Sequence, residues 1–334
     1  MAWYTKTLKA YFTPDELRDL TELSDGRGLW EVVKNWAWIA AAMALVALWP
    51  ATLPGWTIIA PVVLALFIIG GKQLGCAIIM HDAGHNALFK TPQLNEFFGT
   101  WFGAAPILLD LPRYRTYHLR HHRHTGLETD PDKGLTTGYP TTRASMVRKV
   151  LRDLTGLTGL KGQLGVLAMH AGLIEFELGG RVHRIDQTGR STWDVVRTFA
   201  RSFWKPLVAQ LVLVGVLWAI GQPLLYLLWI GALLTTYNFS LRVRSIAEHS
   251  VVADREDPLV NTRTTRANPI EHLLFAPLNV NYHAEHHLLM SAPCYKLPEM
   301  HRMLRERGYY RDATYAPGYW FVVRQAMSAP VSTR

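Results

Sequence analysis

The 334-residue sequence is poor in cysteine and in acidic residues. Its two cysteines, Cys76 and Cys294, are far apart and form no Cys-x-x-Cys pair, so they exclude a disulfide framework and a cysteine-built metal site. Asp and Glu number 26 against 35 Lys and Arg, which gives a formal net charge of +9. Zinc-finger spacings and RNP sequences are also absent, so we expect no nucleic-acid partner despite the positive charge. The polar, partly acidic stretch 1–15 lacks the pattern of a cleavable signal peptide.

Long apolar runs are what the sequence does contain. Hydrophobic residues make up 49% of it and cluster in two pairs of runs, each pair joined by an uncharged turn. The runs are 36–49, 56–71, 206–220 and 223–241, and the turns are 51–55 and 221–222. A spanning helix needs about 20 residues, and flanking tryptophans and continuing helix supply what the shorter runs lack. We predict an all-α integral membrane fold with two transmembrane helical hairpins (four spans); the alternative is a soluble helical protein with a very apolar core.

The basic residues predict the orientation of these hairpins. Neither turn contains Lys or Arg, and apart from Lys72, where the helix should leave the lipid and continue to His81 and His85, all basic residues fall on the opposite side. Basic residues accumulate on the cytoplasmic side of membrane proteins. We therefore expect a multi-pass membrane protein, of the inner membrane if its source is bacterial, whose termini and histidine-rich cap are cytoplasmic.

The remaining segments are predicted to lie outside the lipid core. Thr13, Pro14 and Glu16 have the pattern of a capping box that starts an amphipathic interfacial helix. Segment 97–109, interrupted by Gly and Pro, is predicted to be a re-entrant or interfacial helix, and segment 125–205 a polar, irregular cap. The predicted divisions are an N-terminal cytoplasmic or interfacial helix at 1–34, a membrane domain with its cap at 35–305, and a C-terminal tail at 306–334.

The histidines form a repeated pattern. The spacing His-x-x-His-His occurs twice among only 14 histidines, and a further pair stands four residues apart. Residues at i, i+3 and i+4 share one face of a helix, so each motif is predicted to direct three imidazoles, the commonest protein metal ligand, toward one point. These eight candidate ligands are His81, His85, His118, His121, His122, His283, His286 and His287. They are too many for one tetrahedral ion and enough for two ions of higher coordination.

Other histidines and carboxylates are candidates for lesser roles. His249, just beyond the fourth apolar run, is predicted as a ninth ligand, with a lone interfacial histidine as the alternative. His124 should point off the ligand face of its motif. Four isolated histidines should be surface or hydrogen-bonding residues: His170, His183, His272 and His301. Acidic neighbours of the candidate ligands either orient imidazoles or are solvated; they are Asp82, Glu248 and Glu285. For the motifs themselves, the alternative is solvated surface histidines or separate structural sites.

The position of such a site favours oxidative chemistry. A redox-inert metal would need fewer ligands, and a metal transporter would place its ligands at mid-membrane inside its helices. Here the histidines follow the ends of apolar runs, where a site can reach an apolar chain drawn from the lipid and receive electrons from the cytoplasm. A redox cofactor, rather than an acid or base, is needed to cleave an unactivated C–H bond.

Three motifs resemble the histidine boxes of the membrane fatty acid desaturase family. They are His-Asp-Ala-Gly-His-Asn-Ala-Leu-Phe at 81–89, His-Leu-Arg-His-His-Arg-His-Thr at 118–125 and Asn-Tyr-His-Ala-Glu-His-His-Leu at 281–288, followed by Pro293 and Leu-Pro-Glu-Met-His at 297–301. The resemblance extends over about 35–305 and is specific in order and spacing. It implies a four-helix membrane domain with a cytoplasmic cap, a non-haem di-iron centre of two Fe ions, and O2 as co-substrate.

The same resemblance implies roles for individual residues. The eight paired and clustered histidines would ligate the irons, and His249 matches an extra histidine that many members carry between the second and third boxes. In stearoyl-type members an asparagine four residues earlier reaches the metal through water; here that position is Ser245, which argues against the animal acyl-CoA subtype. A His-Pro-Gly-Gly haem-domain signature is absent, so we expect a separate electron donor, a ferredoxin or cytochrome-type carrier with its reductase.

The sequence therefore predicts an O2-dependent oxidoreductase that introduces a double bond into a fatty acyl chain, lipid-linked in our interpretation. Hydroxylases and ketolases share the boxes, so oxidation of a lipid, sphingolipid or carotenoid to an alcohol or ketone is the alternative reaction. From another class, a histidine-rich metal transporter or metal-dependent receptor would need polar groups within the apolar runs, and few are present. Those few are Thr235, Thr236, Asn238 and Ser240.

Overall fold

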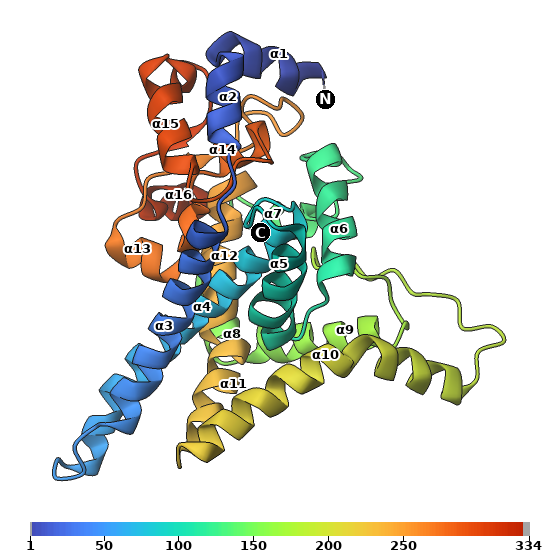
Figure 1. The fold of residues 1–334 in the computed structure, drawn as a ribbon, viewed down its shortest axis with the longest axis vertical. Helices are drawn as coiled ribbons and strands as arrows, with labels where there is room; N and C mark the ends of the chain where they lie inside the picture. Colours follow the sequence, from blue (N-terminus) through green and yellow to red (C-terminus); the bar gives the residue numbers. More distant parts are fainter. Residues whose placement is uncertain (1, 330–334) are drawn as a thin grey trace.

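The computed structural model describes residues 2–329 as a mostly helical protein in which several long helices extend from a helical cap (Figure 1). The helices of the first half are α1 Ala2–Tyr11, α2 Pro14–Leu20, α3 Asp25–Ala47, α4 Ile59–Gly84, α5 Pro92–Phe98, α6 Leu111–His124, α7 Lys133–Thr136, α8 Arg143–Leu154 and α9 Leu157–His170. Those of the second half are α10 Thr192–Ala219, α11 Tyr226–Leu234, α12 Thr236–His249, α13 Pro269–Leu274, α14 His283–Leu288, α15 Leu297–Glu306 and α16 Tyr319–Ala326.

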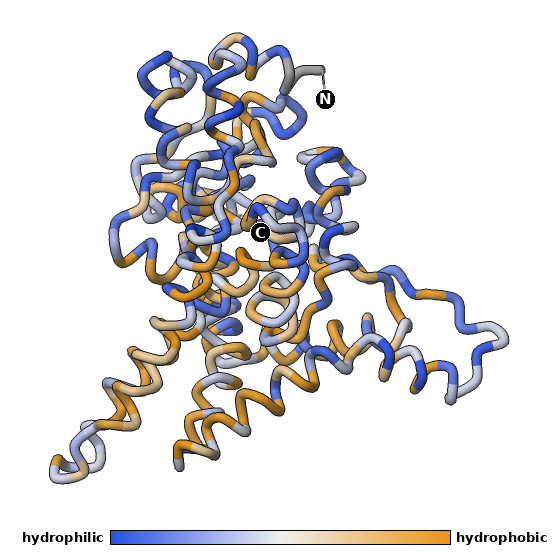
Figure 2. The backbone as a smooth tube through the Cα atoms, viewed as in Figure 1, coloured by the Kyte–Doolittle hydropathy of each residue, from blue (hydrophilic) through white to orange (hydrophobic). Residues whose placement is uncertain are grey.

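Among the described residues, four helical segments are long and apolar enough to cross a membrane. They are Asp25–Ala47, Gly55–Gly84, Thr192–Ala219 and Pro223–His249. The lower parts of these segments are apolar, whereas the cap above them is largely polar (Figure 2). This confirms the prediction of a mostly helical protein with four candidate membrane-spanning helices, each longer than the apolar run that predicted it.

The local sequence explains where several helices begin and end. The predicted capping box at α2 is confirmed, because Thr13 Oγ1 accepts from the Glu16 backbone N–H at 3.3 Å and the Glu16 carboxylate accepts from the Thr13 N–H at 2.8 Å. Ser191 and Asp194 form a second capping box at the start of α10. After α10 the chain reverses at Gly221, whose φ of +72° is accessible to glycine at little cost.

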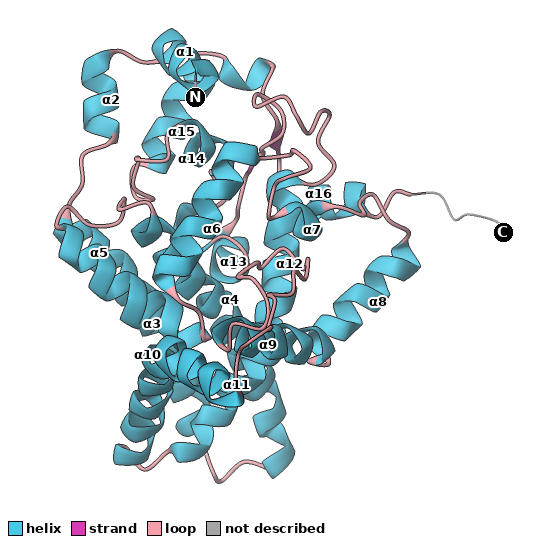
Figure 3. Ribbon diagram, turned by 90° about the vertical axis from the view of Figure 1, so that its right-hand side faces the viewer, coloured by secondary structure: helices cyan, strands magenta, loops and turns pink. Residues whose placement is uncertain are grey.

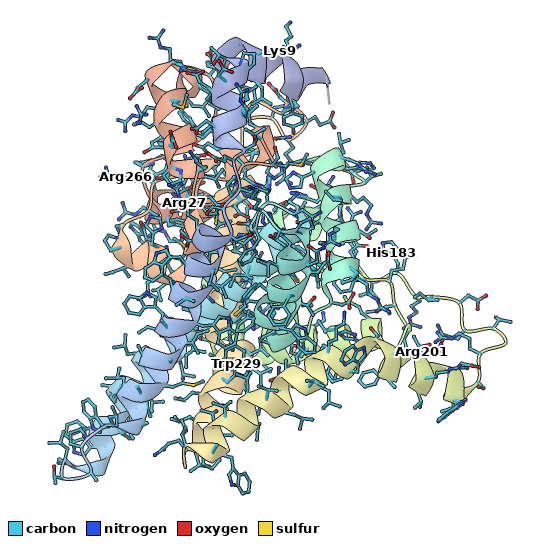
Figure 4. All side chains as sticks on the ribbon, in the orientation of Figure 1. Lys9, Arg27, His183, Arg201, Trp229 and Arg266 are labelled. Atoms are coloured by element: carbon cyan, nitrogen blue, oxygen red, sulfur yellow. The ribbon has the colours of Figure 1, made fainter. Side chains whose placement is uncertain are left out.

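Helix α4 is central in the fold because it packs against α3, α6, α11, α12 and α13. A Cβ atom on Gly70 would lie 2.3 Å from Thr236 Oγ1, so only glycine allows α12 to approach this closely. On the other side, Gln73 Nε2 donates to the Trp229 carbonyl oxygen at 2.8 Å. Trp229, labelled on α11 in Figure 4, is fully buried, and its ring stacks on Trp36 at 5.8 Å. These contacts join the first pair of long helices to the second.

The prediction that segment 125–205 is irregular is wrong. It contains α7, α8, α9 and the first half of α10, and α8 and α9 are two distinct helices in Figure 3. Helix α8 starts where Thr142 Oγ1 caps the Ser145 N–H at 3.2 Å, and Met146 and Val150, four residues apart, pack into an apolar cluster with Ile246. The Gly, Arg and Thr content of the segment concealed this helical periodicity.

The prediction that one helix continues past Lys72 to the first histidine pair is confirmed, whereas the near-complete burial of Lys72 was not predicted. Lys72 lies in the middle of α4, and its relative exposure is only 7%. Helix α4 continues past it as far as Gly84, packed by neighbouring elements of the cap as well as by the other long helices.

Segment 97–109 and the N-terminal region also differ in detail from the prediction. Instead of one helix, 97–109 forms the end of α5, a π-helical turn at Gly99–Ala104 and a 3-10 turn at Ala105–Ile107, all packed near α4. Helix α2 ends at Leu20, which is buried in a cluster with Leu297 and Met300 of α15 instead of facing lipid.

Residues beyond α15 pack against the rest of the cap. A short parallel pairing joins β1 Thr264–Thr265 to β2 Tyr315–Ala316. Tyr309 is buried, with its ring edge-on to Tyr11 at 5.2 Å. The divisions of the chain at residues 34 and 305 stay predictions.

Candidate metal centre

Four elements bring the candidate ligands to one region of the cap. Helix α4 runs without a break to Gly84 and carries His81, with His85 as its C-cap residue. Helix α6 starts where the Asp110 carboxylate accepts from the Arg113 N–H at 3.0 Å, and it carries the second motif at its end. Helix α14 carries the third motif, and His249 is the last residue of α12.

All nine predicted site residues converge, and they form two groups. Within each group, one nitrogen of every ring lies within 4.8 Å of the corresponding nitrogens of the others. The first group is His81, His85, His118, His122 and His286; the second is His121, His249, His283 and His287. The second and third motifs each contribute to both groups. In α6, for example, His118 and His122 share a face at i, i+4, while His121 is turned toward the other group.

Inside each group, ring nitrogens face other ring nitrogens instead of ordinary hydrogen-bond donors or acceptors. Nε2 of His122 lies 2.9 Å from Nε2 of His118 and 3.1 Å from Nε2 of His286. Nε2 of His249 and His283 are 2.9 Å apart. Five buried ring nitrogens have no hydrogen-bond partner within residues 2–329: His81 Nε2, His85 Nε2, His283 Nδ1, His287 Nδ1 and His287 Nε2. Buried polar atoms are nearly always satisfied, so this convergence of unsatisfied nitrogens fits two metal ions.

Burial favours the protonation state that a metal ligand needs. It holds the pKa of His118, His122 and His286 well below its usual range and lowers that of His85 to about 4. These rings are therefore neutral at physiological pH, with a lone pair available to a metal ion. His121 differs, because Asp132 and Asp130 outweigh the effect of burial and raise its pKa.

Two carboxylates orient histidine rings by hydrogen bonds to Nδ1, the nitrogen that faces away from the group. His81 Nδ1–H donates to Asp82 Oδ1 at 2.7 Å, and His121 Nδ1–H donates to Asp130 Oδ1 at 2.8 Å. Each bond leaves Nε2 as the free nitrogen that faces the group. Asp82 could be predicted as a partner of His81 because the two residues are adjacent in sequence. The role of Asp130, which lies in the loop after α6, could not be predicted. The run Asp-Pro-Asp at 130–132 is typical of a turn but does not indicate a contact with His121.

The other two carboxylates singled out in the sequence behave differently from Asp82. Glu248 pairs with Arg244 Nε at 2.6 Å and lies 3.5 Å from His283 Nδ1, beside the second group. The Glu285 carboxylate forms no hydrogen bond or ion pair with any of the nine candidate ligands, all of which lie in the described part of the chain. This buried carboxylate accepts from His301 Nδ1 at 2.5 Å and also bonds Thr264 and Tyr310, so it ties α14 to the C-terminal part of the cap.

The remaining histidines lie outside both groups. His124 approaches Thr129 Oγ1 at 2.7 Å and joins neither group. His170 is buried between Ser202 Oγ and the Leu108 carbonyl oxygen, and His183 lies on an outlying loop (Figure 4). His272 contacts the Ala276 carbonyl oxygen at 3.2 Å.

Ser245 lies beside the second group, but its hydroxyl group is directed away from the histidines. Its Oγ donates to the Leu241 carbonyl oxygen at 2.8 Å, within its own helix. Ser245, Arg244 and Glu248 help to line a pocket of about 40 Å³, large enough for one water molecule.

Replacing Asp130 by asparagine should lower metal affinity and activity by about 10–100-fold, because partners of ligating imidazoles fix ring orientation and tautomer. The Asp130 carboxylate also accepts the backbone N–H groups of Gly126 and Asp132, at 2.9 and 2.8 Å. Asn can retain one of these acceptor roles, so the Tm should fall little while metal per chain falls clearly. Metal analysis and thermal unfolding on the same sample separate the two effects. Full metal content in a folded Asp130→Asn variant would show that Asp130 does not support a ligand.

The fold and the two histidine groups define a helical protein with four candidate membrane spans and two candidate metal-binding groups of histidines. The chain belongs to the fatty acid desaturase family, whose model matches residues 54–319. It is 27% identical to a dihydrorhizobitoxine desaturase of Bradyrhizobium elkanii over 75% of this chain and 70% of that protein. It is 25% identical to an sn-1 oleoyl-lipid 12-desaturase of Synechocystis over 71% of this chain and 66% of that protein. A Caenorhabditis elegans putative sphingolipid delta(4)-desaturase/C4-monooxygenase is 34% identical over 24% of this chain and 22% of its own.

Proposed function

We propose that the protein is an O2-dependent membrane desaturase that introduces a double bond into a lipid-linked fatty acyl chain. The observation that carries the proposal is the pair of histidine groups, whose inward nitrogens lie within 4.8 Å of one another and lack other partners. In a member of the desaturase family, the simplest occupants of two such groups are two iron ions.

The nine histidines would hold the metal ions, five around one and four around the other. Bound there, the two ions would supply the oxidising chemistry that removes hydrogen from an unactivated C–H bond with O2 and two electrons. The protein's own part is to hold neutral rings in place. Asp82 and Asp130 fix the tautomer of His81 and His121, and the Arg244–Glu248 ion pair balances charge beside His283.

The presence of an apolar pocket supports the proposal that the substrate is an acyl chain from the bilayer. A pocket of about 490 Å³ lies between α3 and the α10–α11 pair, with Met43, Leu217 and Trp229 among its lining residues. Trp36 also lines this pocket, and its Nε1–H donates to the Phe102 carbonyl oxygen at 3.1 Å. Phe102 belongs to the π-helical turn that packs on α4, the helix that carries His81.

The proposed topology has two hairpins with all three histidine boxes, the cap and both termini on the cytoplasmic side. Basic residues of the cap and the uncharged connections at 51–55 and 221–222 support it. Electrons would then reach the site from a separate cytoplasmic carrier, of the ferredoxin or cytochrome type, with its reductase.

Single cysteines at Gly55 and Gln222 should react with a membrane-impermeant thiol reagent only from the outer face, because both positions are exposed in the hairpin connections. Gln222 is a better position than Gly221, whose φ of +72° disfavours a side chain. The native Cys76 and Cys294 are buried and should not react with the reagent. Arg184→Cys, on the exposed loop before α10, is the matched control and should react only from the cytoplasm. Cytoplasmic labelling of either hairpin position would refute the two-hairpin topology.

Hydroxylation is the second candidate reaction, favoured by one observation. The Caenorhabditis elegans relative carries a name that joins a desaturase and a monooxygenase activity. Desaturation removes two hydrogens from adjacent carbons, whereas hydroxylation ends after the first with transfer of oxygen, and both start from the same metal site.

Lipid analysis of a host that expresses the gene tests the proposal directly. We expect acyl chains two mass units lighter, each with a new double bond, in cells with the protein and none in cells with an equal amount of the His286→Ala variant. Acyl chains sixteen mass units heavier would assign hydroxylation instead. An unchanged lipid profile at verified expression and iron content would contradict both.

A further inference from the structure

A small polar pocket lies between the first two long helices and α13, away from the histidine groups. It has a volume of about 170 Å³ and is lined by Lys34 and Asn35 of α3, Lys72 of α4, and His272 and Asn279, among others. None of the nine candidate ligands lines it. In Figure 1, α13 lies beside α3 and α4 at the level where the long helices enter the cap. The volume is below the range of about 300–1,000 Å³ for whole small-molecule sites, so the pocket suits a compact polar group.

The pocket carries more positive than negative charge. Lys34 Nζ donates to Glu31 Oε1 at 2.7 Å, so this carboxylate is paired. Lys72, with a relative exposure of 7%, has no hydrogen-bond or ion-pair acceptor among residues 2–329. Leaving an ammonium group buried without a counter-charge is costly, and an ionisable residue inside a spanning helix usually marks a binding site. Two ammonium groups thus share one carboxylate, and the pocket can accept an anion.

The pocket lies at the level where lipid headgroups are expected. Trp30, Lys34 and Trp38 follow one another at four-residue spacing on one face of α3; the two tryptophans are exposed, by 60% and 48%, and Lys34 between them is half-buried. Tryptophan gathers at the boundary between hydrocarbon and water, where a lysine can reach lipid phosphate groups. The position of Lys34 between two exposed tryptophans places the mouth of the pocket at this boundary.

An apolar groove lies on the same face of α4, and Ile68 in its lining is one helical turn from Lys72. The groove has a volume of about 800 Å³ and lies between α4 and α13, with Leu64, Ile68 and Leu274 among its lining residues. Leu64, Ile68 and Lys72 are four residues apart and share one helix face. An acyl chain in this groove would end with its polar group beside Lys72.

We propose that this pocket binds the phosphate group of a phospholipid from the surrounding leaflet, with Lys72 as the inner contact and Lys34 at the rim. The adjoining groove holds one acyl chain of the same lipid. This inference rests on the membrane placement of the long helices and is independent of the metal centre, so it can be tested on protein with or without metal.

The test is a titration of the purified full chain, in a phosphate-free maltoside detergent, with short-chain phosphatidylglycerol. Because a ligand that binds only the folded protein raises its Tm, we expect a saturable rise in the Tm of the wild type and a dissociation constant from the same curve. Lys72→Met removes the charge at similar length, and binding should weaken about tenfold or more. Lys161→Met, at an exposed position of α9, is the matched control and should bind as the wild type does.

A variant that is expected to bind the phospholipid more tightly distinguishes loss of the binding site from a folding defect. Glu31→Gln releases Lys34 from its carboxylate, so the phospholipid should bind several-fold more tightly. Sodium phosphate, titrated alone, should produce no saturable effect in the concentration range of the lipid, because it gains nothing from the groove. Unchanged affinity of Lys72→Met would overturn the proposal. Saturation by sodium phosphate at the same concentration as by the lipid would overturn it too, since the pocket would then be a site for free phosphate.

Discussion

Replacement of His286 by alanine should abolish desaturation, with a loss of more than about 100-fold, since even the loss of an imidazole's hydrogen-bonding partner costs about 10–100-fold. The His286 ring lies near the rings of all four other members of the first group. Its Nε2 is 3.1 Å from that of His122, and its ring centroid is 4.4 Å from that of His81. Alanine leaves four histidines there and an open coordination position on the protein side. Product formation and metal per chain, measured on the same membranes, should both fall.

His124→Ala is the control for this experiment. His124 belongs to the same histidine-rich stretch as His122, yet it contacts Thr129 and joins neither group. We expect it to retain substantial activity and its full complement of metal, because His124 is only half-buried and substitutions away from the core usually change stability by no more than about 0.5 kcal/mol. An inactive, metal-poor His124 variant together with an active His286 variant would show that the wrong face of the histidine helices has been assigned to the metal.

Replacement of His249 by alanine should be as damaging as replacement of His286, although His249 belongs to no histidine box. Its Nε2 lies 2.9 Å from Nε2 of His283, and its Nδ1–H donates to the Asn261 carbonyl oxygen at 3.1 Å, which points Nε2 into the second group. The second group has only four members, so the variant would leave three ligands. We expect it to lose about one of two metal ions per chain and nearly all activity.

A second substitution at His249 separates metal loss from misfolding. Glutamine fills more of the space left by imidazole, so His249→Gln should fold with a Tm close to that of the wild type while still lacking a nitrogen ligand. We expect it to be as inactive as His249→Ala. If either variant kept full metal and high activity at matched protein levels, the ligand set would shrink to eight and His249 would be an interfacial histidine.

The convergence of the histidines was predictable because helix periodicity makes it a local property. His118, His121 and His122 had to share one face of a helix, and the repeat at 283–287 gave the matching half. The division into two groups was not predictable in this way. Residues three and four positions apart on a helix differ in direction by only a fraction of a turn. Which of the two groups each ring joins therefore depends on how α6 and α14 cross. Only the three-dimensional arrangement shows His121 apart from His118 and His122.

The apolar helices were predictable for a similar reason, whereas long-range polar contacts were not. Uninterrupted apolar runs identified four long helices, and the continuation of one of them past Lys72 was predicted, but the burial of Lys72 was not. Its burial depends on α13, which is separated from it by almost 200 residues of chain. Asp130 and Glu285 illustrate the same limit. A carboxylate near a histidine in sequence can bond a ligand, as Asp82 does, or turn to another partner, as Glu285 turns to His301.

The central claim is that nine histidines hold two iron ions in one chain. The most direct test is metal analysis of purified, active protein from iron-sufficient cells, combined with activity on the same sample before and after removal of the metal by a chelator. We expect about two irons per chain, no activity after chelation, and recovery on addition of ferrous iron but not of zinc. A single metal ion per fully active chain, or activity that persists without iron, would contradict the claim.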